Sequence, residues 1–231
     1  MRSSKDYEKL SVKEMFEQSK DEKNSNTVTR ASDMGVRVAL MLLMPYIFWL
    51  SKYNEAYVSS VHNRQMHLNF DGIMQAFHNL ISNANMIVHE SGHGICYIIS
   101  CPQFMTALNG TLFQLALPIL FIYYYYRRSN MTLVGLGGIW FAQNLVYVAW
   151  YMSYAHDPRR YPFFLGGDAI HDFWYLFSQL GVLEYDWLIA GITRFIAVTL
   201  LLGSYLYLLY IAFLKNGKPK RKKRGRKKYE Q

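Results

Sequence analysis

Residues 36–53 read VRVALMLLMPYIFWLSKY. The stretch approaches the roughly 20 residues that an α-helix needs to cross a bilayer. Arg37 lies near its first end, and Trp49, Lys52 and Tyr53 lie near its second. Basic and aromatic residues are enriched at the membrane–water interface, so both ends resemble those of a transmembrane helix. We therefore predict that a membrane domain begins here.

Four later segments continue this pattern, and they cover residues 72–100, 108–126, 131–154 and 187–214. The predicted fold is an all-α polytopic integral membrane protein with about five transmembrane helices, in a range of four to six. Five crossings would place the two termini on opposite sides, whereas basic residues near both ends favour the same side. Either 170–183 also enters the membrane or 72–100 is more than one element.

Composition divides the chain into a polar N-terminal arm (1–33), an integral membrane domain (34–214) and a basic C-terminal tail (215–231). Residues 215–228 carry ten Lys or Arg and no acid, so the formal net charge of +9 becomes 9 − 10 = −1 without them. Because the excess charge belongs to the tail alone, we expect no specific nucleic-acid binding. We expect the tail to lie at an anionic lipid surface in the cytoplasm.

The segment MIVHESGHGICYIIS, residues 86–100, contains the pattern His-Glu-x-x-His. Residues four apart lie on one face of a helix, so His89 and His93 can bind one Zn²⁺ ion. Glu90 then flanks the metal and can act as general base toward a zinc-activated water. Ionisable residues within an apolar segment are functional candidates, so we predict a zinc site here.

The same helix face is polar along its length. It carries His78, Ser82, Asn85, His89, His93, Cys96 and Ser100. Gly92 and Gly94 would let a neighbouring helix approach. Cys96 and Cys101 are the two cysteines of the chain, and on a continuous helix this spacing would place them on different faces. We therefore predict neither a disulfide framework nor a Cys-rich zinc finger.

A third zinc ligand is expected in LGGDAIHDFWYLF, residues 165–177. We predict His171 as that ligand, with Asp172 either orienting His171 or binding the metal itself. Asp168 is expected to be the N-cap of the helix that follows, and it is a further alternative ligand.

Amide side chains also occur inside the later apolar segments. Asn109, Gln143 and Asn144 are candidates to contact a substrate backbone or an oxyanion, and Gln114 lies in a similar setting. Hydrogen bonding between helices is the alternative role for each.

The HESGH segment resembles the HExGH helix of site-2-type intramembrane zinc proteases. The resemblance implies zinc ligation by His89 and His93 and a general base at Glu90. The third ligand does not transfer, because that family uses an Asp in an Asn-Pro-Asp-Gly or Leu-Asp-Gly setting, which this sequence lacks.

The chain is also similar to uncharacterised bacterial membrane proteins that pair HExGH with a later GGxxHDW-like segment. That segment is matched here by Gly166, Gly167, His171 and Asp172, with Phe173 in place of Trp. The likeness runs from about His89 to Trp187, and it implies no known substrate.

The leading hypothesis is an integral-membrane zinc metallohydrolase, a peptidase that cleaves a peptide bond near or within the bilayer. Its partners would be membrane lipids and a membrane-protein or peptide substrate, and its location the inner membrane of a bacterium. The alternatives are a membrane zinc hydrolase acting on a lipid or amide, and a non-catalytic metal-binding membrane protein.

Overall fold

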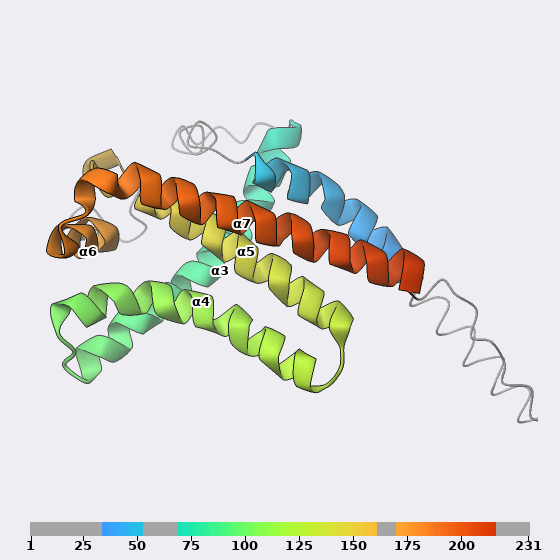
Figure 1. Ribbon diagram of the computed structural model, residues 1–231, viewed down its shortest axis with the longest axis horizontal. Coiled ribbons are helices and arrows are strands. Elements are labelled where there is room, and N and C mark those ends of the chain that lie inside the picture. The colour runs from blue at the N-terminus through green and yellow to red at the C-terminus, as the bar shows by residue number, and fades with distance from the viewer. Residues whose placement is uncertain (1–33, 53–68, 161–169, 216–231) are drawn as a thin grey trace, which may run out of the picture. The chain divides into compact units, whose positions relative to one another are not determined.

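The computed structural model describes residues 34–52, 69–160 and 170–215, and each regular element in these ranges is helical (Figure 1). The first helix is Met34–Ser51. It is followed by α3 (Phe70–Ile98), α4 (Gln103–Arg127), α5 (Met131–Met152), α6 (Asp172–Leu180) and α7 (Asp186–Leu209). Short 3-10 turns cover Pro158–Arg160 and Leu183–Tyr185, and a π-helix at Tyr210–Lys215 continues α7.

Four helices are long and apolar enough to cross a membrane, and these are Met34–Ser51, Gln103–Arg127, Met131–Met152 and Leu183–Leu214. The prediction of an all-α polytopic membrane protein is confirmed. Segment 72–100 is a single helix, α3, but it is not one of the four, because its polar face lowers its hydropathy. The nine residues of α6 are too few to cross a bilayer.

The chain forms two compact units. One combines residues 1–42 with 209–231, and within its described part Arg37 Nε donates to the Ala212 carbonyl at 3.0 Å. The Arg37 guanidinium also lies 5.3 Å from the centroid of the Phe213 ring. The other unit, residues 43–208, contains every described residue of the candidate site.

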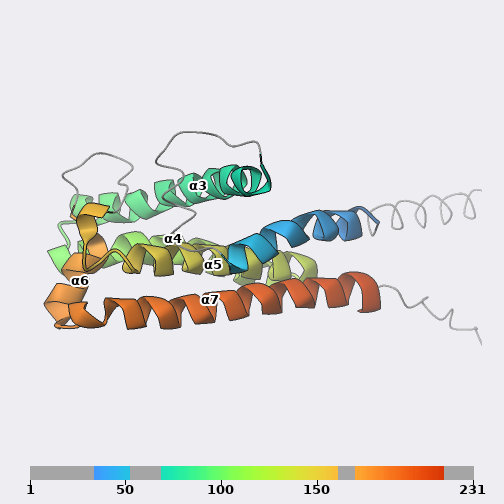
Figure 2. The same ribbon diagram turned by 90° about the horizontal axis from the view of Figure 1, so that it is seen from above.

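In this second unit α4 packs against both α3 and α5, which precede and follow it (Figures 1 and 2). The connections 99–102 and 128–130 are short, and short connections make successive helices antiparallel neighbours. Asn130 begins α5 by accepting a hydrogen bond from Leu133 N at 3.2 Å. The first turns of α4 consequently lie beside the last turns of α3, which carry the His-Glu-x-x-His motif.

The short helix α6 is held in place by an apolar face. Phe173, Leu176 and Phe177 are buried in a cluster with Tyr151 and Tyr154 of the α5 region. Positions i, i+3 and i+4 share one helix face, so this face directs the first turn of α6 toward α4 and α5. Its first residue is Asp172, which the packing of the cluster brings to the interior.

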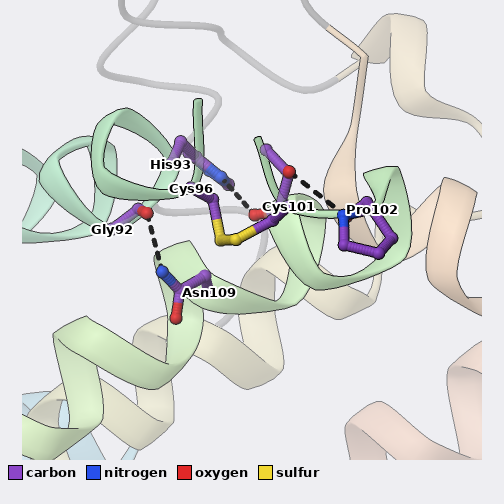
Figure 3. Close-up of a disulfide and its surroundings, with 7 residues drawn as sticks. Gly92, His93, Cys96, Cys101, Pro102 and Asn109 are labelled. Carbon is purple, nitrogen blue, oxygen red and sulfur yellow. Dashed lines mark hydrogen bonds between the residues drawn. A yellow bond between two sulfur atoms is a disulfide. The ribbon is translucent and has the colours of Figure 1, made fainter. Parts of the chain in front are cut away.

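Cys96 and Cys101 form a disulfide across the α3–α4 turn, beside His93 (Figure 3). The expectation that they face apart was wrong because it assumed a continuous helix. The helix ends at Ile98, and Ser100 adopts a left-handed φ of 57° that reverses the chain. Cys101 N then donates to the Cys96 carbonyl at 2.9 Å, which brings the two side chains together.

Replacing both cysteines with serine should destabilise this turn. The chain-entropy model gives a loss of about 2 kcal/mol in the free energy of unfolding for so short a loop. We expect the thermal midpoint of the detergent-solubilised protein to fall by several degrees without reductant, and reductant should lower the wild-type midpoint to the same value. An unchanged midpoint in the double variant would show that the disulfide contributes nothing to stability.

Candidate metal site

The helix that carries the motif buries its polar side. The buried residues of α3 are Gln75, His78, Asn85, His89, Gly92 and Cys96. Its apolar side chains face outward, since Leu80, Ile87 and Ile98 are 70%, 68% and 83% exposed. This arrangement reverses that of a helix on a water-soluble protein and suits a helix whose outer face meets lipid. The predicted polar stripe is confirmed except at Ser100, which lies beyond the helix end.

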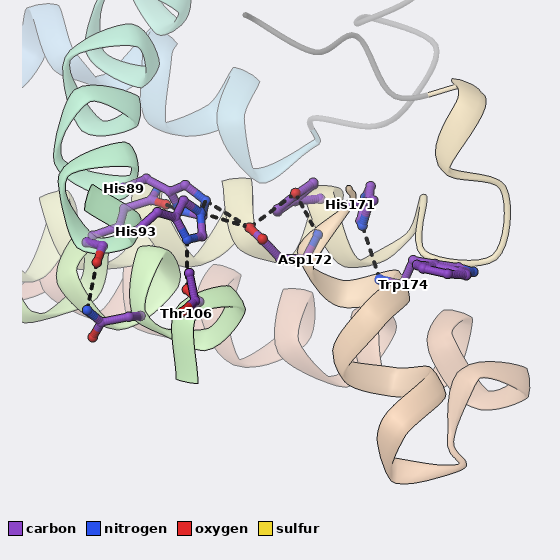
Figure 4. A network of polar contacts seen from close by, with 10 residues as sticks. His89, His93, Thr106, His171, Asp172 and Trp174 are labelled. Atoms are coloured by element: carbon purple, nitrogen blue, oxygen red, sulfur yellow. Dashed lines mark hydrogen bonds and ion pairs between the residues drawn. The ribbon is translucent and has the colours of Figure 1, made fainter. Parts of the chain in front are cut away.

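Three side chains from α3 and α6 meet in the interior (Figure 4). His89 Nε2 lies 3.0 Å from Asp172 Oδ2, and His93 Nε2 lies 3.3 Å from the same oxygen. The two Nε2 atoms are 3.1 Å apart. His89 and Asp172 are buried and His93 is partly buried, and the three form a group that can hold a metal ion.

The other nitrogen of each imidazole has a partner on α4. His93 Nδ1 lies 2.7 Å from the Thr106 carbonyl oxygen, and His89 Nδ1 lies 3.1 Å from Gln114 Oε1. A carbonyl oxygen only accepts hydrogen bonds, so Nδ1 of each ring carries the hydrogen. Each Nε2 then presents a lone pair toward Asp172, which is the form in which histidine binds metals.

The centre of the group therefore consists of acceptors. Two lone pairs and a carboxylate oxygen this close repel one another unless a proton or a metal cation lies among them. Two imidazoles and one carboxylate are also a ligand set that zinc uses in hydrolytic enzymes.

Asp172 is oriented by Tyr151 on α5. The Asp172 backbone N donates to the Tyr151 hydroxyl at 3.1 Å, and that hydroxyl donates to Asp172 Oδ2 at 3.3 Å. Tyr151 is itself buried in the cluster that holds α6. The carboxylate is thus fixed by both its helix and a neighbouring side chain.

Gly110 on α4 leaves space next to the two histidines. A Cβ atom at this position would lie 2.5 Å from His93 Nε2 and 2.8 Å from His89 Nε2. Both distances are far below van der Waals contact, so a side chain here would displace the ligand atoms. Gly110 therefore permits close approach of α4 to the two imidazoles.

His171, the residue predicted as third ligand, does not join this group. It is the N-cap of α6, and its Nδ1 accepts a hydrogen bond from Trp174 N at 3.2 Å. Burial lowers the pKa of His171 to about 4, so its ring is neutral. Asp172, the stated alternative, lies in the group with His89 and His93. Asp168 lies outside the described residues, and the N-cap role predicted for it belongs to His171.

No protein-family model, curated protein or solved structure matches this chain.

Glu90 follows His89 on α3, and its side chain is exposed. It lies outside the group of three converging ligand atoms. Successive residues on a helix point about 100° apart, so Glu90 does not point in the same direction as His89.

The amides proposed as substrate contacts bond to protein atoms. Asn109 Nδ2 donates to the Gly92 carbonyl at 2.8 Å and so ties α4 to α3. A Cβ atom at Gly92 would lie 2.5 Å from the Asn109 carbonyl oxygen, which confirms the predicted close approach there, whereas Gly94 has open space. Gln143 and Asn144 are buried and hydrogen-bonded within the bundle.

Four contributors to the site were not predicted, namely the Thr106 carbonyl, Gly110, Gln114 as the partner of His89, and Tyr151. Gln114 carried a signal, since a buried amide in an apolar helix needs a partner. The Thr106 carbonyl and Gly110 carried no sequence signal that would link them to the histidines.

Proposed function

We propose that this protein is an integral-membrane metallohydrolase that holds a zinc ion through His89, His93 and Asp172. Glu90 is its general base. The observation that carries the proposal is the convergence of three acceptor atoms, His89 Nε2, His93 Nε2 and Asp172 Oδ2, within 3.3 Å of one another. Each imidazole has its Nδ1 hydrogen bonded elsewhere, so the group favours a cation at its centre.

A bound zinc ion would supply Lewis acidity, which lowers the pKa of water to about 7. Three protein ligands would leave room for a water on a bound zinc ion, as a hydrolytic site requires. Glu90 would accept the proton of the attacking water and pass it to the leaving group. Glu90 directly follows His89 in the chain and its side chain is exposed, which supports this role.

The peptide bond is the proposed substrate because the HESGH segment resembles the zinc-binding helix of site-2-type proteases. The cleaved bond would lie near or within the bilayer, in the inner membrane of a bacterium. The same ligands and base could also hydrolyse an amide lipid, and a direct comparison of the two substrate classes distinguishes these alternatives.

Glu90→Gln should retain zinc and lose turnover. Gln keeps the shape of Glu but cannot take a proton, and removal of a general base costs about 10²- to 10⁴-fold in rate. Purified protein would first be analysed for zinc and iron, with the His89→Ala/His93→Ala variant as the metal-free reference. Hydrolysis would then be followed by mass spectrometry on transmembrane peptides and, in parallel, on an amide lipid.

Wild-type protein without bound zinc, even after zinc is supplied, would overturn the proposal. Iron in place of zinc would overturn the zinc assignment, because two histidines and one carboxylate also form the iron site of oxygenases. Full activity of Glu90→Gln would remove Glu90 from the mechanism. Turnover of the lipid alone would exclude the peptidase assignment.

A further inference from the structure

One turn of α5 anchors a set of buried hydrogen bonds that reaches the candidate metal site. Trp140, Gln143 and Asn144 share a helix face, at positions i, i+3 and i+4. The side chains of Gln143 and Asn144 are 2% and 0% exposed. Two branches of hydrogen bonds leave this turn, one toward His89 and the other toward His78.

The branch to His89 has a fixed direction. Asn144 Nδ2 donates to the Trp140 carbonyl oxygen at 3.0 Å, and a backbone carbonyl can only accept. The other end of this amide, Oδ1, therefore faces Gln114 and accepts from Gln114 Nε2 at 2.9 Å. Gln114 must then present its own oxygen to His89 Nδ1, at 3.1 Å. The Trp140 carbonyl thus specifies that His89 carries its hydrogen on Nδ1.

The second branch starts from the indole of Trp140, which can only donate. Trp140 Nε1 donates to Asn85 Oδ1 at 3.0 Å, and Asn85 Nδ2 donates to Gln143 Oε1 at 3.0 Å. Gln143 Nε2 donates to Ser82 Oγ at 3.2 Å, and Ser82 contacts His78 Nε2 at 3.2 Å. This branch ends about three helical turns from His89 and does not touch the three ligands.

Neither branch is suited to proton conduction. An amide has separate donor and acceptor atoms and does not release one proton as it takes up another, as a hydroxyl or an imidazole does. What a row of amides does supply is orientation, because each fixes the direction of the next.

We infer that Gln114 and Asn144 are positioning residues that hold His89 in the tautomer with Nδ1 protonated, leaving Nε2 free to bind the metal. The inference rests on the proposed metal site. Gln114 touches His89 and acts through it, and Asn144 acts through Gln114. A hydrogen bond to the outer nitrogen of a metal-binding histidine is worth about 10- to 100-fold in metal affinity.

The tautomer can be observed in the metal-free protein. With ¹⁵N-labelled histidine at about pH 8, the His89 signals should show a protonated Nδ1 and an unprotonated Nε2. The His89→Gln variant identifies these signals by their disappearance. Gln114→Leu should convert them to a mixture of tautomers. A wild-type His89 with its hydrogen on Nε2 would overturn the inference whether or not zinc binds.

Zinc affinity provides the second readout, measured by competition with a chelator. Gln114→Leu and Asn144→Leu should weaken binding about 10- to 100-fold. Gln114→Glu keeps an acceptor next to Nδ1 and should recover most of that loss. The matched control is Gln143→Leu, which removes an equally buried amide from the same turn but belongs to the other branch. It should stay within about threefold of wild type, well below the effect of an orienting partner.

The outcomes separate this inference from the proposed function. If wild-type protein binds no zinc, the proposed metal site fails, and the ¹⁵N spectra still decide the tautomer. If wild-type protein binds zinc and Gln114→Leu binds it equally well, the positioning role is wrong and the metal site stands. Equal losses in Gln143→Leu and Asn144→Leu would show a general packing effect, which also overturns the inference.

Discussion

Asp172→Asn is expected to abolish zinc binding, while His171→Asn is expected to leave it unchanged. In the wild type, Asp172 Oδ2 faces both His89 and His93. Asparagine preserves the size of the side chain but removes the negative charge and replaces one carboxylate oxygen with an NH₂ group, which does not bind metals. The loss should exceed about 100-fold, the upper end of what a residue that only orients a ligand contributes. At position 171, asparagine is a strong N-cap, so α6 should still begin at Asp172.

This pair of variants decides between two third ligands that are adjacent in sequence. Zinc affinity would be measured by chelator competition, with the thermal midpoint of each variant recorded to show that both are folded. If His171→Asn loses zinc and Asp172→Asn keeps it, the third ligand is His171, as the sequence predicts, and Asp172 does not bind the metal. If both variants keep zinc, the third ligand is neither of these two residues.

The all-α membrane fold and the histidine pair could be predicted because each depends on a local pattern. Apolar stretches of transmembrane length, such as 131–154, correspond to helices within a few residues, here Met131–Met152. His89 and His93 lie on one face because any regular helix places residues four apart there. Neither prediction requires knowledge of which helices touch.

Which of His171 and Asp172 lies beside the two histidines could not be predicted, because it depends on where a helix begins. His171 and Asp172 differ by one position, and both are ligand-type residues. The structure makes His171 the N-cap, and Asp172 becomes the first residue of α6, pointing toward the histidines. This orientation is set by an apolar cluster that includes Phe173 and Tyr151. The cluster forms only when α6 packs on α5.

The disulfide shows the same limit at a helix end. The spacing of Cys96 and Cys101 separates them on a helix and joins them across a turn. The chain turns at Ser100, which has a left-handed backbone conformation. The conformational preferences of serine do not predict such a conformation. The sequence identified the residue types of the site, whereas their partners on α4 and α5 depend on tertiary packing.

Gly110→Ala is expected to eliminate zinc binding without altering any ligand. The added methyl would lie 2.5 Å from His93 Nε2 and 2.8 Å from His89 Nε2. Neither ring can turn away cheaply, because the Thr106 carbonyl and Gln114 hold the two Nδ1 atoms. The methyl would therefore occupy space that the ligand atoms need around a metal. We expect a loss of more than about 100-fold in zinc affinity, as large as that from removing a ligand.

Gly94→Ala is the matched control, because a Cβ atom there meets nothing within 4 Å. It lies on α3 one residue after His93, and alanine in an open helical position should be neutral or slightly stabilising. Zinc affinity and thermal midpoint would be measured for both variants. A folded Gly110→Ala protein that binds zinc like wild type would mean that the metal is not held between His89 and His93. Weaker binding in that variant alone would place the ion at this surface of α4, where only glycine leaves room for the two imidazoles.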